Sequence, residues 1–133
     1  MPRRLPMIPC PPATQDIAIN LANRAKAIDV ANYGPPNPRE RNDAYWQSIA
    51  NEWGTTPAEA RTMRCGNCAA FDVSEPVMDC VRRGLERDGI SADEVIVQGE
   101  LGYCHAFRFK CAASRTCSAW IVGGPITEYR GAR

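Results

Sequence analysis

The sequence predicts an α+β fold with an N-terminal extended arm, a set of helices, and a loop-rich C-terminal cysteine module with short strands. Prolines crowd the first 13 residues, and apolar residues recur at helical spacing from residue 14. From residue 95 onward, glycines, aromatics and β-branched residues are frequent and helix signals are few. We therefore divide the chain into an extended proline-rich arm (1–13), a helical region (14–63) and a cysteine-rich metal-binding module (64–133).

The bulk composition excludes several classes of protein. The 133 residues carry a formal net charge of +1, which gives no electrostatic reason to expect nucleic acid or a phospholipid surface as partner. No apolar run approaches the roughly 18 residues that cross a bilayer, and prolines interrupt the stretch that a secretory signal would need. We expect synthesis in a cytoplasm, where structural disulfides are rare. The seven cysteines therefore favour metal binding over disulfides.

The arm is predicted to be extended because its prolines remove backbone donors and disfavour helix. These prolines are Pro2, Pro6, Pro9, Pro11 and Pro12. The arm has too little apolar content to fold on itself, so we expect Leu5, Met7 and Ile8 to insert into apolar grooves of a neighbouring subunit. Cys10, isolated in the arm, fits the behaviour of a small buried hydrophobe. Such an arm predicts a subunit of a homo- or hetero-oligomeric assembly.

Two helices are predicted after the arm. The first begins at Thr14 and is stopped by Gly34 and the two prolines that follow. Its apolar face is expected to contain Ile17, Leu21, Ala25 and Ile28. The second begins at Asn37 and ends at Gly54, and its packing face is Tyr45, Trp46, Ile49 and Trp53.

Two capping patterns and one apolar stripe predict the remaining helices. Thr56 to Glu59 has the form of a capping box, so a short helix should lead directly into Cys65. Residues 74–87 suit a helix with Val77, Val81 and Leu85 on one face, closed by Gly89. Residues 91–94 repeat the capping pattern over about one turn. From Val95 onward we expect loops with two or three short strands.

The cysteines carry the functional signal. Cys65 and Cys68 flank Gly66 and Asn67, which tolerate the tight turn that aims two thiolates at one centre. Such spacing suits zinc or an iron–sulfur cluster, whereas the βαβ setting of a redox pair is missing. A site of four thiolates needs two more, and the candidates are Cys80, Cys104, Cys111 and Cys117. Burial on a helix explains Cys80, while Cys104 and Cys117 occur in loop-like segments near aromatics.

The segments CGNCAAF, GYCHAF and CSAW resemble the cluster-binding half of the high-potential iron–sulfur proteins. The resemblance implies a cubane 4Fe–4S cluster held by Cys65, Cys68, Cys104 and Cys117. It also implies a pocket of aromatic residues, here Phe71, Tyr103, Phe107 and Trp120. Two departures stand out: 35 residues separate Cys68 from Cys104, longer than the family's usual gap, and Thr116 replaces an aromatic before the last cysteine.

Other assignments of the sulfur atoms stay open. An alternative alignment takes Cys80 as the third ligand and Cys104 as the fourth, and zinc is an alternative to the cluster. In the preferred assignment Cys80 and Cys111 are left over, as alternative ligands or as a disulfide if their Cα atoms lie within about 7 Å. His105, the sole histidine, is not expected to bind metal because strand alternation turns it away from Cys104.

The block from AYWQSIANEW to TCSAW also looks like a group of small proteins encoded by tailed bacteriophages. No phosphate-binding loop or catalytic triad is recognisable, so we expect no enzyme. The leading hypothesis is a structural subunit of the head–tail or tail region of a virion, made in the host cytoplasm. It would bind other virion subunits through its arm and neither nucleic acid nor membrane. The alternatives are a soluble electron-transfer iron–sulfur protein and a zinc-stapled protein-binding module.

Overall fold

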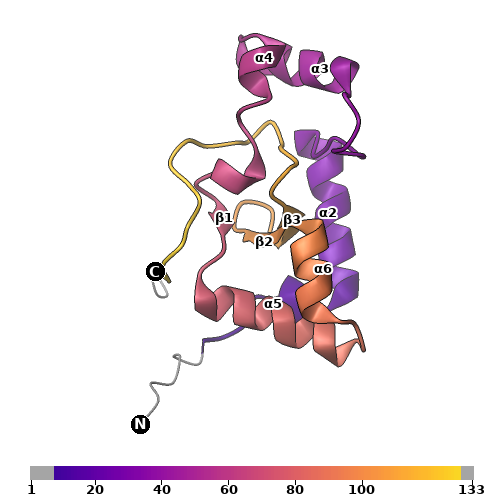
Figure 1. Ribbon diagram of the computed structural model, residues 1–133, viewed down its shortest axis with the longest axis vertical. Helices are drawn as coiled ribbons and strands as arrows, with labels where there is room; N and C mark the ends of the chain where they lie inside the picture. Colours follow the sequence, from indigo (N-terminus) through magenta and orange to yellow (C-terminus); the bar gives the residue numbers. More distant parts are fainter. Residues whose placement is uncertain (1–7, 130–133) are drawn as a thin grey trace.

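The computed structural model of the chain describes residues 8–129. In this part of the chain six α-helices surround a small antiparallel sheet, so the predicted α+β class is confirmed (Figure 1). The helices are α1 (Pro12–Gln15), α2 (Ile17–Ala31), α3 (Asp43–Trp53), α4 (Pro57–Ala60), α5 (Glu75–Arg87) and α6 (Ala92–Gly99). The strands are β1 (Phe71–Asp72), β2 (Leu101–Cys104) and β3 (Phe109–Ala112). Among the described helices, none has the length and apolar character that a membrane crossing requires.

The sheet divides the molecule into two sides. Its order is β1-β2-β3, with Phe71 opposite Cys104 and Gly102 opposite Cys111. Because side chains alternate along a strand, these four residues share one face. The other face carries Tyr103, which packs with Val77 of α5. In Figure 1, α5 runs along the bottom of the view and α3 and α4 lie at the top, with the sheet between them.

The helix start predicted at Thr56 is confirmed. The Thr56 hydroxyl accepts a hydrogen bond from the Glu59 N–H at 3.2 Å, which starts α4 directly before the cysteine segment. Helix α5 begins after Ser74 and buries the predicted stripe of Val77, Val81 and Leu85. Helix α6 is longer than the single predicted turn because it continues to Gly99.

Helix α3 starts later than predicted. The chain forms a turn over residues 37–42, in which the Asn37 side chain accepts from the Arg39 N–H and the Asn42 side chain donates to the Asn37 carbonyl. These local bonds compete with helix formation, so α3 begins at Asp43. Trp46 and Ile49 are buried as expected, and Gly54 ends the helix.

The predicted apolar face of α2 is wrong. Ile17 is 51% exposed, Leu21 56% and Ile28 43%, whereas the buried residues of the helix are Asn20, Ala27 and Ala31. Hydrogen bonds decide this orientation: Asn20 Oδ1 accepts from the Lys110 N–H at 2.7 Å. The Asn23 amide donates to the Arg108 carbonyl at the same distance. Two amide side chains thus turn α2 toward the β2–β3 hairpin and leave its larger apolar residues in solvent.

The arm also differs from the prediction within the described residues. Helix α1 begins at Pro12, inside the segment expected to be extended. Ile8 packs against Ala13, Val77 and Tyr103 of its own chain rather than standing free. Cys10 forms a disulfide with Cys80, with a Cα–Cα separation of 5.5 Å. Residues 8–13 are therefore tied to α5, while Leu5 and Met7 lie outside the described residues.

Candidate metal centre

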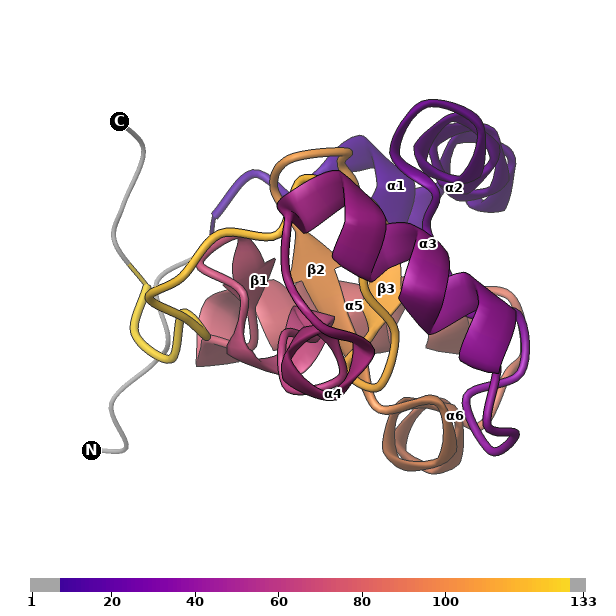
Figure 2. The same cartoon turned by 90° about the horizontal axis from the view of Figure 1, so that it is seen from above.

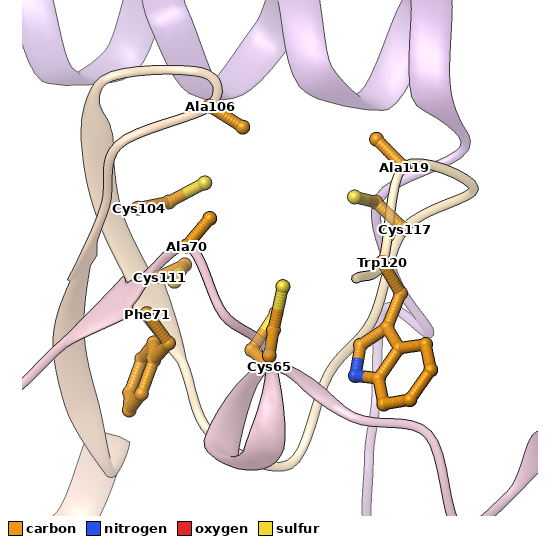
Figure 3. Close-up of a pocket in the computed structure, with 10 residues that line it drawn as sticks. Cys65, Ala70, Phe71, Cys104, Ala106, Cys111, Cys117, Ala119 and Trp120 are labelled. Atoms are coloured by element: carbon orange, nitrogen blue, oxygen red, sulfur yellow. The ribbon is translucent and has the colours of Figure 1, made fainter. Parts of the chain in front are cut away.

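Five cysteines line one cavity beneath the sheet face that carries Cys104. They are Cys65, Cys68, Cys104, Cys111 and Cys117, all free and buried. The rest of the lining is Ala70, Phe71, Ala106, Ala119 and Trp120. The space between these residues measures about 300 Å³, counting the part that opens to solvent. Figure 3 shows Cys104 and Cys117 pointing toward each other across it, with Cys65 reaching up from below.

The CxxC pair is shaped by a single turn of 3₁₀ helix, η1 (Cys65–Asn67). The N–H groups of Cys65 and Gly66 donate to the carbonyls of Arg115 and Ala113, at 2.6 and 2.9 Å. These bonds hold the turn against the loop that follows β3. The Ile121 N–H lies 3.5 Å from the Cys68 sulfur, so a backbone donor already points at one predicted ligand.

The sheet supplies two further thiols. Cys104 ends β2, and Cys111 lies within β3 on the same face. Gly102, beside these two cysteines, leaves room for the ring of Phe71, because a Cβ at this position would collide with that ring. The Phe71 ring thus covers β2 at the edge of the cavity, which keeps this wall apolar.

Cys117 is positioned by the end of α2. Its neighbour Thr116 exchanges two backbone hydrogen bonds with Gly34, at 2.7 and 3.0 Å. The Ser118 N–H donates to the Ala31 carbonyl at 2.7 Å. The residues on both sides of Cys117 are therefore fixed, although the segment has no regular secondary structure. Ala27, Ala31 and the cysteines belong to one hydrophobic cluster, so the predicted boundary at residue 64 does not separate two cores.

Two tryptophans connect the cavity to the upper helices. Trp53 at the end of α3 donates its indole N–H to the Ser118 carbonyl at 3.1 Å. Trp120 donates to the Asn67 side chain at 2.9 Å and to the Arg64 carbonyl at 3.0 Å. The two indole rings lie 6.2 Å apart. Figure 2 shows α3 crossing above the sheet.

The thiols have unequal proton affinities. A hydrogen bond with Cys111 lowers the pKa of Cys104 to about 6, although burial acts in the opposite direction. Hydrogen bonds to Cys104 and Cys65, together with burial, raise the pKa of Cys111. Burial raises the pKa of Cys117 to about 12. A bound cation would be needed to hold Cys117 as a thiolate, because coordination removes the thiol proton.

The four predicted ligands all line this cavity, and so do two of the four predicted aromatics. Phe71 and Trp120 are part of its wall. Tyr103 was predicted to join them, but this is wrong: it points to the opposite face of the sheet, as strand alternation requires next to Cys104. Phe107 packs against the same cluster but lines a neighbouring hollow with Asn23, Lys26 and Arg108.

Cys80 and His105 lie away from the cavity lining. Cys80 is bonded to Cys10 in this structure, so it is neither a free thiol at the cavity, as the alternative alignment expected, nor bonded to Cys111. The His105 ring instead meets the buried Asp72 carboxylate at 2.8 Å. Burial alone would raise the pKa of Asp72, but hydrogen bonds from His105 and Ser74 outweigh it and lower that pKa.

The preferred set of predicted ligands did not include Cys111, yet Cys111 lines the cavity. The alternation of buried residues in β3, with Phe109 and Cys111 on one face, could have indicated this. What the sequence could not supply was the register that places this face beside Cys104.

Comparisons of the chain with protein families, with curated proteins and with solved structures found no significant match.

Proposed function

We propose that the chain is a non-enzymatic structural subunit of a tailed-phage virion whose cysteine cavity holds a 4Fe–4S cluster. The observation that carries the cluster is the convergence of five buried thiols on one cavity. The ligands would be Cys65 in η1, Cys68 directly after it, Cys104 at the end of β2 and Cys117 in the loop after β3. When bound, the cluster would bridge these segments and add its binding free energy to folding.

The arrangement of the cysteines on several sides of one cavity suits a cluster. Zinc draws its ligands to about 2.3 Å from one point. Within residues 8–129, no three or more His, Cys, Asp or Glu side chains form a group suited to one ion. Thiols placed around a hollow, with Cys104 and Cys117 on opposite sides, suit a larger inorganic group (Figure 3). The apolar lining and the N–H directed at the Cys68 sulfur also fit the surroundings of a cluster.

The cluster can be tested on anaerobically purified protein by absorption, iron and sulfide analysis. We expect a broad visible absorption band with four iron and four sulfide per chain. Cys65→Ala and Cys117→Ala should each lose this band, because each removes a ligand. The matched control is the Cys10→Ala/Cys80→Ala variant, which removes two sulfurs but none from the cavity and should keep the band. A colourless protein that contains zinc would contradict the proposal.

The virion role rests on the likeness of the sequence to small tailed-phage proteins and is supported by the surface of α2. Ile17, Leu21 and Ile28 lie on one face of this helix at helical spacing and are all exposed. Grouped apolar residues on a surface are typical of sites where proteins bind one another. The occupant that fits the proposal is another protein subunit of the same particle.

Incorporation into particles tests this role. We expect the chain in purified particles of the phage that encodes it, and Leu21→Ser should lower its amount there, as measured by quantitative mass spectrometry. Its stability should change by no more than about 0.5 kcal/mol because the side chain is exposed. Val97→Ser on α6, another exposed apolar position, is the control and should be incorporated normally. Equal incorporation of both variants would contradict the assignment of this face.

A further inference from the structure

The Cys10–Cys80 disulfide is the main tie between residues 8–10 and the rest of the protein. It joins the segment before α1 to the middle of α5. Among the hydrogen bonds between described residues, none involves the backbone of residues 8–10. Ile8 adds an apolar contact with Val77 and Tyr103. Few noncovalent contacts therefore hold this segment in place.

Helix α1, by contrast, is held to α5 by contacts that involve no sulfur. The Gln15 side-chain amide donates to the Cys80 carbonyl at 2.7 Å. A Cβ added at Gly84 would overlap the Thr14 carbonyl, so the backbones of the two helices lie in close contact. Loss of the disulfide should therefore free residues 8–10 and leave α1 docked on α5.

The two cysteines of the disulfide differ in their access to solvent. Cys80 is fully buried, whereas Cys10 is partly exposed. Thiol–disulfide exchange begins when a thiolate attacks one sulfur, and its rate depends on access and on how readily the other sulfur leaves. An incoming thiolate can therefore reach Cys10, which makes Cys80 the leaving group.

Arg83 lies beside both sulfurs. Its Nη2 atom is 3.4 Å from Cys10 Sγ and 3.8 Å from Cys80 Sγ. Its Nε atom is 3.0 Å from the carboxylate of Asp79, one turn earlier on α5, and this ion pair keeps the guanidinium near the disulfide. A positive charge beside a thiol favours the thiolate, and a more stable thiolate leaves faster. Arg83 can therefore assist the departure of Cys80.

We propose that the Cys10–Cys80 disulfide is a latch that small thiols open at Cys10, with Arg83 stabilising Cys80 as it leaves. The small thiolate forms a mixed disulfide with Cys10, the Cys10–Cys80 bond breaks, and its electron pair stays on Cys80 Sγ as a thiolate. A second small thiolate attacks the small-molecule sulfur of the mixed disulfide, which releases Cys10 as a thiolate and the small thiol as its oxidised dimer. The latch is then open in a reducing compartment and closed in an oxidising one.

Exchange with glutathione tests the site of attack in the purified full-length protein. After acid quenching and alkylation in denaturant, peptide mass spectrometry should find glutathione on Cys10 and an alkylated thiol at Cys80. Glutathione on Cys80 would overturn the inference, and so would a disulfide that stays intact in millimolar glutathione. These readouts follow only Cys10 and Cys80, so they do not depend on whether the cavity binds a cluster.

Substitution of Arg83 tests its part in the exchange. Arg83→Met should open several-fold more slowly than the wild type, and Arg83→Lys, which keeps a positive charge, should open faster than Arg83→Met. Arg82→Met is the matched control, because Arg82 pairs with Asp93 instead and its loss should leave the rate unchanged. If Arg83 only packs against the disulfide, Arg83→Met would expose the sulfurs and open faster. Faster or unchanged opening would therefore overturn the assigned role.

Methyl NMR of isoleucine-labelled protein tests whether opening frees the segment. The Ile8 methyl groups pack in the cluster that contains the Tyr103 ring, so their chemical shifts should move toward free-chain values once Cys10 and Cys80 are reduced. Ile49, which is buried in a separate cluster, is the control and should keep its shifts. Unchanged Ile8 shifts in the reduced protein would mean that packing alone holds residues 8–10, and the disulfide would not be a latch.

Discussion

The two faces of the small sheet use cysteine in opposite ways. On the face that carries Cys104, five thiols surround a hollow and none is paired with another. On the Tyr103 face, α5 packs against the sheet, and its Cys80 is bonded to Cys10. Cys80 is fully buried, and its partner lies just before α1. The sheet therefore separates free thiols from the disulfide, which limits exchange between them.

The difference shows that the backbone around a cysteine decides its role. Cys10 and Cys80 have Cα atoms 5.5 Å apart, within the range that a disulfide bridges. The thiols of the cavity instead belong to a 3₁₀ turn, two strands and a loop that are fixed by hydrogen bonds to other segments. Side chains held apart in this way can surround a ligand that none of them could bind alone.

The largest effect expected from a change on the Tyr103 face is loss of the disulfide. Cys10→Ala/Cys80→Ala opens a crosslink between residues 70 positions apart, which should lower the free energy of unfolding by about 2–4 kcal/mol. Denaturant unfolding of the purified protein measures this change. If the variant unfolds like the wild type, the segment before α1 is held by packing alone.

The parts of the fold that were predicted correctly depend on local chemistry. Thr56 caps α4, and Gly54 ends α3, because each acts within one turn of the chain. The stripe of α5 was also predictable, since Val77, Val81 and Leu85 recur at helical spacing on a helix with polar residues elsewhere.

The parts that were missed depend on contacts between distant segments. The orientation of α2 is set by Asn20 and Asn23, whose partners lie on the β2–β3 hairpin 85 or more positions away. A pattern of apolar residues carries no information about such bonds. The Cys10–Cys80 pair is similar, because no spacing rule connects a proline-rich segment with the middle of a helix.

The candidate site was predicted in part, because it depends both on local sequence and on contacts between distant segments. The four cysteines that the resemblance named, Cys65, Cys68, Cys104 and Cys117, all line one cavity, and their role as ligands stays a prediction. The wrong prediction that Tyr103 lines the cavity could have been avoided. In a strand, the neighbour of an inward-facing Cys104 must face outward. Predicting that Cys111 lies at the cavity requires the strand register, which the sequence does not reveal.

A substitution at Gly102, on the Cys104 face, is expected to lower stability by less than loss of the disulfide does. A Cβ atom added at this position collides with the ring of Phe71, a residue that also lines the cavity. Gly102→Ala should therefore push the ring toward the cavity and lower the free energy of unfolding by about 1–3 kcal/mol. It should also speed the loss of the proposed cluster under oxygen, which absorption would follow.

A double-mutant cycle with Phe71→Leu determines whether the ring is the cause. Leucine is smaller than phenylalanine, so the Gly102→Ala penalty should shrink when Phe71 is replaced, and the two changes should be non-additive. Gly89→Ala is a useful control because no atom lies near its added Cβ, although its φ of 76° makes alanine strained. Gly89 is far in sequence from the cavity residues, so its variant should lose stability without faster cluster loss. If the two changes in the free energy of unfolding are instead additive, the β2 backbone itself requires glycine at position 102. The wall of the cavity then does not depend on the close contact between Gly102 and Phe71.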